Sequence, residues 1–368
     1  MSIARNLANL IGNINAGGGG VNRNVIINGA MNVAQRSTSE TGLGASSGYF
    51  TCDRWLTNFS TSGRSTMTQD SSAPSGFANS LKVACTTADT SIASDEQFVI
   101  SQRIEGQNLQ AFAKGTSDAK PFSVSFYVKG NASATYICEL RDRDNSRSAG
   151  KTFNVTTDWT RVELTFPADT TGAFDDDNAR SLDFNIFLHA GTDKTSGTLS
   201  NTFASEVSAN RAGGLSTSFF DSTDRTFFIT GVQLEVGQNP TEFEHEPFER
   251  TEDKCYRYFQ RHRSGDLFTG FHDGSSRSTT RVAANGYKYF RTMRTAPSLT
   301  VSDVGDFSIR DAPNNVKGSP TSISIGRPGV NFTTLIFDIS GGGLTSGEPH
   351  SVVADNTSSA ALKFDSEL

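Results

Sequence analysis

The chain has 368 residues and a formal net charge of -6 at pH 7, and it contains 27 Phe but only 2 Trp and 4 Met. It has no dense Lys/Arg run, which argues against nucleic-acid binding, because such binding depends on neutralising phosphates. No apolar run approaches the roughly 18 residues of a membrane-spanning helix, so we expect no membrane insertion. A hydrophobic fraction of 35% suits β-sandwiches, whose strands expose every second residue.

The first segment, residues 1–20, combines a short apolar stripe with a run of glycines. The stripe predicts a short N-terminal helix, and its members recur at helical spacing: Ile3, Leu7, Leu10 and Ile11. A helix this short is marginal alone, so its apolar face must be buried. We expect it to anchor the chain on another protein or on copies of itself; the alternatives are a helix packed on its own domain and a disordered terminus. The segment lacks the apolar core and cleavage site of a signal peptide, which predicts synthesis in the cytoplasm.

Residues 21–250 are expected to form one all-β domain. The segment FSVSFYV places apolar side chains on one face at Phe122, Val124, Phe126 and Val128, and the segments 161–166 and 182–188 repeat this alternation. Without intervening helical periods, such strands predict an antiparallel sandwich. We expect Trp55 and Trp159 to be structural. The long polar segments 36–48, 168–180 and 190–216 are expected to be functional or mobile loops.

The end of this domain is predicted from residues 227–248. Val232, Leu234 and Val236 alternate with Gln233 and Glu235, which is typical of a strand with one buried face. The charged and aromatic residues that follow predict a covering strap and a short connector. From residue 251 to 368 we expect a second, smaller β-sandwich, which opens with a strand in KCYRYFQRH.

Metal-binding patterns are weak in this sequence. The four cysteines are far apart and include no C-x-x-C pair, so we expect neither a cysteine metal site nor disulfides. Asp175, Asp176 and Asp177 gather hard oxygen ligands in one loop. These residues predict either a structural calcium ion or a solvated acidic turn.

The sequence favours a binding protein over an enzyme. Its five histidines occur at neither HxH nor HExxH spacing, G-x-S-x-G is absent, and the glycine run lacks the Lys-Ser/Thr of a phosphate-binding loop. We therefore expect no catalytic residues and no cofactor beyond the calcium ion.

Sugar binding is predicted from aromatic side chains, because exposed rings stack on the C–H faces of sugars. The second domain offers such rings close together in the sequence, and we expect an exposed platform made of Tyr256, Tyr258, Tyr287 and Tyr289. A subunit interface is the alternative, since tyrosine-rich strands also suit interfaces.

The junction carries a family resemblance. The run GVQLEVGQNPTEFEHEPF and the Cys-x-Arg-Tyr-Phe element at Cys255 resemble the junction found in many tail-fibre and receptor-binding proteins of tailed bacteriophages. The segments NVIINGAMNVAQRSTSETG, YFTCDRW, MRTAPSLTVSD and KFDSEL extend the resemblance over both domains.

The resemblance implies a fold and a function. The first domain would be a jelly roll similar to carbohydrate-binding modules, and the chain a homotrimeric tail fibre that attaches the phage to glycans of the host surface. It would be made in the host cytoplasm, sit at the virion tail and contact other virion proteins through its N-terminal helix. A capsid decoration protein, a head fibre or a tail adaptor is the alternative. A glycan-degrading tailspike is disfavoured because the regular short repeats of a parallel β-helix are missing.

Overall fold

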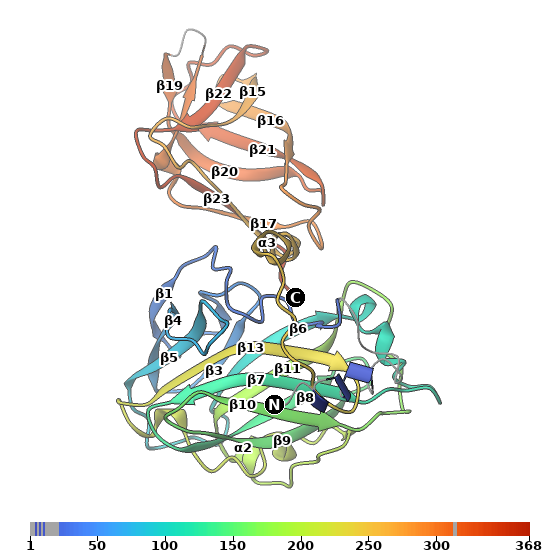
Figure 1. Cartoon of the computed structure of the whole chain (residues 1–368). Coiled ribbons are helices and arrows are strands. Elements are labelled where there is room, and N and C mark those ends of the chain that lie inside the picture. The colour runs from blue at the N-terminus through green and yellow to red at the C-terminus, as the bar shows by residue number, and fades with distance from the viewer. Residues whose placement is uncertain (1–3, 6, 9, 12–21, 312–314) are drawn as a thin grey trace. The chain divides into compact units, whose positions relative to one another are not determined.

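The computed structural model describes residues 4–5, 7–8, 10–11, 22–311 and 315–368. The chain forms two compact units: Met1–Glu252 with Leu368, and Asp253–Glu367 (Figure 1). The described residues between 4 and 11 are helical, in agreement with the prediction. Leu7 and Ile11 of the anchor stripe are 56% and 50% exposed, whereas Ile3 lies outside the described residues.

The first unit contains a six-stranded and a seven-stranded sheet, and all strand pairings are antiparallel. The six-stranded sheet has the order β1 (Ser39–Leu43), β4 (Arg64–Asp70), β5 (Ser80–Thr87), β13 (Thr226–Val236), β7 (Phe122–Gly130), β10 (Thr160–Phe166). The seven-stranded sheet has the order β12 (Ala204–Ser205), β9 (Arg147–Val155), β8 (Ala134–Asp142), β11 (Arg180–Ala190), β6 (Gln97–Glu105), β3 (Leu56–Ser60), β2 (Gly48–Tyr49). This arrangement is the predicted jelly-roll β-sandwich.

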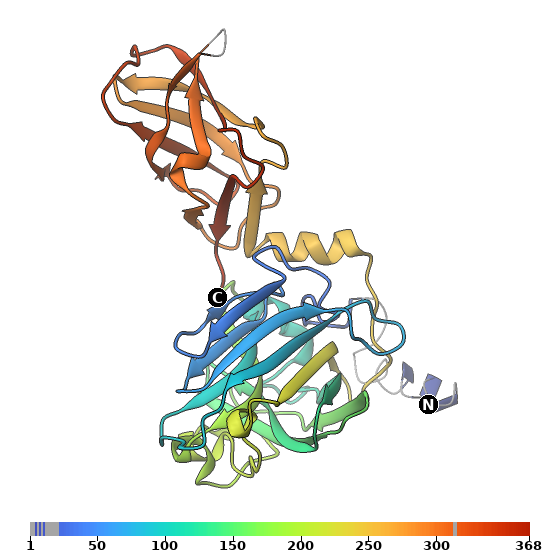
Figure 2. The same cartoon turned by 90° about the vertical axis from the view of Figure 1, so that its left-hand side faces the viewer.

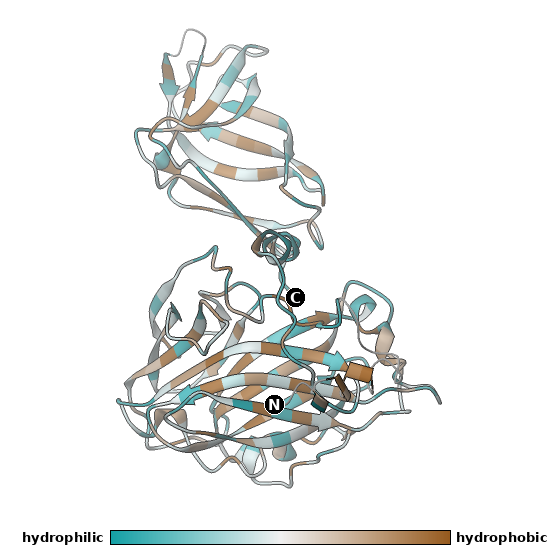
Figure 3. Cartoon of the chain, viewed as in Figure 1, coloured by the Kyte–Doolittle hydropathy of each residue, from teal (hydrophilic) through white to brown (hydrophobic). Residues whose placement is uncertain are grey.

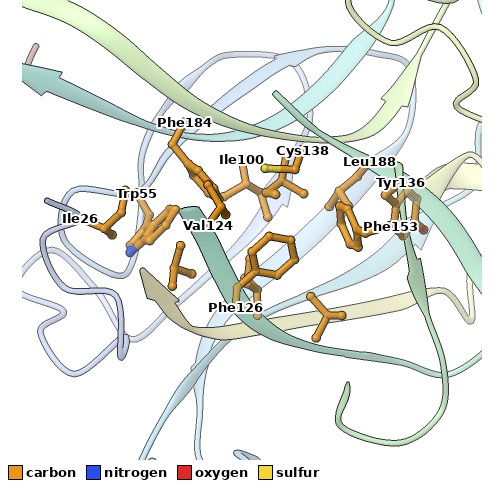
Figure 4. Close-up of a cluster of buried hydrophobic side chains, with 14 of the residues drawn as sticks. Ile26, Trp55, Ile100, Val124, Phe126, Tyr136, Cys138, Phe153, Phe184 and Leu188 are labelled. Carbon is orange, nitrogen blue, oxygen red and sulfur yellow. The ribbon is translucent and has the colours of Figure 1, made fainter. Parts of the chain in front are cut away.

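Phenylalanine is the most frequent residue in the core between the two sheets. Apolar residues alternate with polar ones along strands such as β7 (Figure 3), and Phe126 of β7 meets Phe184 of β11 with ring centroids 6.2 Å apart. Trp55 is 1% exposed, packs edge-on against Phe184 and donates from Nε1 to the Asn28 carbonyl at 3.1 Å (Figure 4). The prediction that Trp55 belongs to the core is therefore confirmed. Trp159 is half-buried and packs edge-on against Phe228.

The last strand of the sandwich, β13, differs from the prediction because both of its faces are buried. Gln233 and Glu235 are fully buried. The predicted strap covers them: Thr241 donates to Glu235 from its backbone nitrogen at 2.7 Å and from its hydroxyl at 2.9 Å, and the Glu244 nitrogen donates to Gln233 at 2.8 Å. The alternating pattern could not reveal this, because polar residues can be buried wherever the strap supplies hydrogen-bond partners.

The connector contains a helix that we did not predict. Helix α3 (Phe248–Tyr256) follows Pro247 (Figure 2), whose carbonyl accepts hydrogen bonds from the nitrogens of Arg250 and Thr251. Thr251 and Cys255, four residues apart, are buried, while the charged side chains between them are half-buried. The charged residues concealed the helical spacing, and the predicted strand is confined to β14 (Phe259–Arg263).

The second unit is a smaller β-sandwich. Its three-stranded sheet has the order β14, β23 (Ala361–Asp365), β17 (Ser298–Val301). Its seven-stranded sheet has the order β19 (Val316–Gly318), β18 (Phe307–Arg310), β22 (Pro349–Ala354), β15 (Gly270–Ser278), β16 (Arg281–Lys288), β21 (Phe332–Ile339), β20 (Pro320–Arg327). One core that includes Phe307, Phe337 and Phe364 joins the two sheets. The predicted all-β fold class is confirmed.

No helix among the described residues is long and apolar enough to cross a membrane. All four cysteines are buried and free of disulfides.

Candidate functional site

The outer face of the seven-stranded sheet in the first unit carries an ordered set of polar side chains. Strand β11 turns Phe184 and Ile186 toward the core, so Asp183, Asn185 and Phe187 lie on the opposite face. Residues paired directly across an antiparallel ladder have their side chains on the same face. The pairings of β11 with β6 and β8 therefore define three rows across the outer face: Arg103–Asp183–Arg141, Ser101–Asn185–Glu139 and Val99–Phe187–Ile137.

The middle row is a buried hydrogen-bond network. The Ser101 hydroxyl and the Asn185 amide oxygen are 2.6 Å apart, and the Asn185 amide nitrogen donates to Glu139 at 2.8 Å. Arg211 donates to both oxygens of Glu139, at 2.8 and 2.7 Å. The side chain of Glu139 is 1% exposed, so this bidentate pair supplies the partner that a buried carboxylate requires.

The apolar row is covered by the long segment between β11 and β13. Phe187, Val99 and Ile137 form a small cluster with Ala190 and Ala212, and Leu199 and Leu215 pack against it. The Arg211 guanidinium also lies 5.3 Å from the centre of the Phe187 ring. The predicted loop 190–216 is thus a cover over one end of the outer face, and it contains the short elements α2 (Thr192–Thr195), β12 and η3 (Ser208–Asn210).

The charged row is partly open to solvent, because Arg103 and Arg141 are half-buried whereas Asp183 is buried. Arg141 donates to Glu206 through two hydrogen bonds, at 2.5 and 2.6 Å, and the two side chains are 20% and 17% exposed. Burial alone would raise the pKa of Glu206, but the hydrogen bonds and charge of Arg141 lower it. Arg180 forms a second bidentate pair with Asp183. The surface-accessible groups of these pairs are the guanidinium groups of Arg141 and Arg180 and the carboxylate of Glu206, which are 20%, 27% and 17% exposed.

An aromatic ring continues the middle row at the edge of the sheet. Tyr49 pairs with Leu56, and Leu56 pairs with Ser101, so the three side chains share the outer face. Tyr49 is half-buried, and the Arg36 guanidinium lies 5.2 Å from its ring centre. Together with the charged row, Tyr49 gives this face a ring and planar polar groups, which are the groups that sugars contact.

Two hollows border the same sheet along β9. The larger has a volume of about 310 Å³ and is lined by Gly150, Lys151, Thr152, Leu199 and Asn201. The smaller, of about 20 Å³, has room for a water molecule and reaches Glu139 and Arg211.

The tyrosine platform predicted in the second unit is wrong for three of its four residues. Tyr258, Tyr287 and Tyr289 are 1%, 4% and 2% exposed and belong to the interior. Tyr287 bonds to His262, with its hydroxyl 2.8 Å from Nδ1. Only Tyr256 is half-buried, with its ring centre 5.2 Å from that of Phe290. Tyr287 packs inward because its ring fills the core while its hydroxyl finds a polar partner in His262.

The predicted acidic turn is exposed. Asp175, Asp176 and Asp177 all face solvent, and Asp177 accepts a hydrogen bond from the Ala179 nitrogen at 2.8 Å. These carboxylates do not form a cluster of three ligand atoms in the part of the chain that the structure describes. Calcium at this turn stays a prediction that no contact in the structure supports.

The residues of the outer face were missed at the level of sequence, although a signal was present. Asp183 and Asn185 alternate with the apolar residues of β11. This alternation predicts a strand, and its polar positions also indicate a polar surface on the opposite face from the core. The partners Glu139, Arg211 and Ser101 come from distant segments, which only the strand order brings together.

No protein-family model matches, and no curated protein matches. Among solved structures, a CBM4 module is 10% identical over 57% of this chain and 97% of its own, with a TM-score of 0.30. The family 11 carbohydrate-binding module of Lic26A-Cel5E of Clostridium thermocellum is 14% identical over 57% of this chain and 100% of its own, with a TM-score of 0.28.

One phage protein is also among the similar structures. The enzymatically active domain of tailspike protein 4 of bacteriophage CBA120 is 12% identical over 58% of this chain and 21% of its own, with a TM-score of 0.29. The neighbours are thus carbohydrate-binding modules together with a phage tailspike domain. Identities and TM-scores this low carry no argument about function, so the site must be argued from its own geometry.

Proposed function

We propose that the chain is a bacteriophage virion protein, a tail fibre or receptor-binding protein, that attaches the particle to glycans of the host surface. The phage assignment rests on the resemblance of the junction and its flanking segments. The glycan assignment rests on one observation: the outer face of the seven-stranded sheet carries the ring of Tyr49 on its edge strand β2 and two bidentate ion pairs farther across the sheet, Arg180–Asp183 on β11 and Arg141–Glu206 with Arg141 on β8. The side chains of Arg180, Arg141 and Glu206 are 27%, 20% and 17% exposed.

The geometry suits sugar hydroxyls because each hydroxyl both donates and accepts a hydrogen bond. A bidentate Arg–carboxylate pair offers donors and acceptors side by side, and its fixed geometry lowers the entropy lost on binding. The buried middle row next to it on the same face, from Ser101 through Asn185 to Glu139, holds this face rigid. A single site of this kind binds weakly, and we propose that a homotrimer makes several such contacts effective together.

The test is glycan binding by the purified full chain, measured on glycan arrays and on whole host cells. The variants Arg141→Ala and Tyr49→Ala should weaken binding by about tenfold or more, which corresponds to about 1.4 kcal/mol. Arg161→Ala is the matched control, because Arg161 pairs with Glu163 at 2.7 Å on β10 of the other sheet. Absence of glycan binding by the wild-type chain, or equal loss in all three variants, would contradict the proposed site.

The position in the virion is tested separately. A label at the C-terminus should appear at the tail, projecting outward, in images of intact particles. Label spread over the capsid shell would overturn the tail-fibre assignment. We propose binding without catalysis, so release of sugar reducing ends from a bound glycan would contradict that part.

A structural virion component is the second candidate, and a specific feature favours it. The second unit exposes apolar side chains after the end of β16 and around the start of β21: Phe290 is 53%, Val330 37% and Phe332 61% exposed. These segments are joined by the hydrogen bond from the Tyr289 nitrogen to the Asn331 carbonyl at 3.2 Å. An apolar surface of this kind suits a contact between virion proteins.

A further inference from the structure

A second cluster of charged side chains lies in the first unit, away from the outer-face rows. Asp89 and Glu96 belong to the loop between β5 and β6, and His189 lies near the end of β11. One ligand atom from each residue lies within 4.8 Å of the other two. The three residues are 6%, 7% and 0% exposed. We call them the buried acidic cluster.

The imidazole of His189 points into this cluster. Its Nδ1 is 2.8 Å from the Ser218 hydroxyl, whereas its buried Nε2 has no hydrogen-bond partner and lies 3.6 Å from Glu96 Oε2. The Ser218 oxygen also accepts from the Phe220 nitrogen at 3.0 Å, and its two lone pairs allow it to accept from Nδ1 as well. In that tautomer Nε2 presents its lone pair to the carboxylates, as in a metal-binding histidine.

The two carboxylates are oriented by short loops. Asp89 accepts hydrogen bonds from the Ser91 nitrogen at 3.2 Å and from the Thr61 hydroxyl at 3.1 Å. Glu96 accepts from the nitrogens of Ser62 and Ala93, both at 3.2 Å. These neutral donors fix the oxygens without supplying a positive charge.

The cluster lacks the counter-charge that other buried acids of this unit possess. Asp142 and Asp169 flank Lys114, whose ammonium lies 2.6 and 3.2 Å from their oxygens. In contrast, neither Asp89 nor Glu96 forms an ion pair with a lysine or arginine among the described residues. Two neighbouring carboxylates without a cation repel each other, at a cost that burial increases.

We propose that Asp89, Glu96 and His189 bind one divalent transition-metal ion, with Zn²⁺ as the representative. One imidazole nitrogen and two carboxylate oxygens suit zinc or manganese, whereas calcium takes oxygen ligands. Tetrahedral zinc ligands with bonds of about 2.0–2.1 Å lie about 3.3 Å apart, close to the 3.6 Å between His189 Nε2 and Glu96 Oε2. Water would complete the coordination.

The proposed ion has a structural role, because the cluster gathers separate segments of the chain. The turn at Thr61 and Ser62, the loop from Asp89 to Glu96, strand β11 and Ser218 all contribute a group. The end of β11 and the loop from Asp89 to Glu96 approach each other closely, because a Cβ atom added to Gly191 would lie 2.0 Å from the carbonyl oxygen of Ala93. An ion bound here raises stability because the unfolded chain does not preserve the site.

The test uses the full chain without a histidine tag, stripped with EDTA and then titrated with Zn²⁺ or Mn²⁺ alone. We expect one ion per chain, measured by mass spectrometry of the desalted protein, and a melting temperature that rises with ion concentration. Glu96→Gln and His189→Gln should weaken binding at least about tenfold. The triple variant D175N/D176N/D177N is the control and should bind like the wild type.

A second measurement does not depend on folding of the variants. The chain contains five histidines, and nitrogen NMR of the wild-type imidazoles should show one Nε2 resonance that shifts on addition of Zn²⁺. The proposal is overturned if the folded wild-type chain binds no ion or if no imidazole resonance moves. It is also overturned if binding survives Glu96→Gln and His189→Gln but is lost in the triple variant, because the ion would then occupy the acidic turn.

Discussion

Replacement of Lys114 by methionine should destabilise the first unit strongly. The ammonium of Lys114 is fully buried and lies 2.6 Å from Asp142 Oδ2 and 3.2 Å from Asp169 Oδ2. It also donates to the carbonyls of Thr171 and Gly172, at 2.8 and 2.7 Å. Methionine keeps much of the volume but removes the charge and every donor, so Asp142 is left buried without a cation.

The magnitude follows from the uncompensated carboxylate. Removal of one partner from a buried ion pair typically costs about 3–5 kcal/mol, and loss of the two carbonyl contacts adds to this cost. Asp169 keeps a cationic partner in the variant, because Arg147 donates to it at 2.8 Å, so Asp169 adds little to the loss of stability. We therefore expect the free energy of unfolding to fall by about 3–5 kcal/mol, which for a unit of this size lowers the melting temperature by roughly 6–20 °C.

The assay is urea unfolding followed by tryptophan fluorescence. Both tryptophans of the chain, Trp55 and Trp159, lie in the first unit, so the signal reports this unit alone. Lys82→Met is the matched control: Lys82 lies 3.3 Å from Asp70, and the two side chains are 33% and 22% exposed. Exposed pairs contribute about 0–1 kcal/mol. The reasoning is refuted if the free energy of unfolding falls by amounts that differ by less than about 1 kcal/mol between Lys114→Met and Lys82→Met.

Three further predictions concern pH, the covering loop and assembly. Burial lowers the pKa of His262 to about 4, below the value near 6.5 that it has in the unfolded chain. The neutral form of His262 therefore contributes about 3 kcal/mol to the free energy of unfolding above pH 6.5, and this contribution is lost as the pH falls toward 4. Hydrogen exchange in β14 should become faster as this stability is lost, and the variant His262→Gln should remove the pH dependence. If exchange in the variant depends on pH as in the wild type, the assignment to His262 is contradicted. Arg211→Met leaves Glu139 buried without its cation and should increase hydrogen exchange across residues 191–218 by a factor of ten or more, whereas unchanged exchange would show that Arg211 does not hold the loop. Replacing the exposed Leu7 and Ile11 by aspartate should abolish incorporation into particles, and incorporation at the wild-type level would refute the anchor.

The class of fold could be predicted from local patterns. A period of two along strands such as β7 places apolar side chains on one face, and this periodicity needs no knowledge of distant residues. The same holds for the core position of Trp55 and for the strap after Val236. These features depend on neighbours in the sequence, so composition and spacing are enough to indicate them.

Helix α3 and the burial of the tyrosines could not be predicted from local sequence patterns. Polar or charged residues on α3 concealed its helical spacing. Tyr287 and Tyr289 could have served at a surface as well as in the interior, because a tyrosine has an apolar ring and a polar end. The packing of the second unit places Tyr287 in the interior, where His262 is the hydrogen-bond partner of its hydroxyl.

Both candidate sites depend on tertiary structure for a related reason. The sequence determined which strands alternate, and so which residues of β11 face outward. It did not determine which strands lie beside β11, because strand order follows from the packing of the whole sandwich. Only that order places Glu139 and Arg211 next to Asn185, and brings Asp89 and Glu96 to His189. Charge interactions act through space over a few ångströms, so residues as distant in the sequence as Asp89 and His189 form a site only after the sheets have formed.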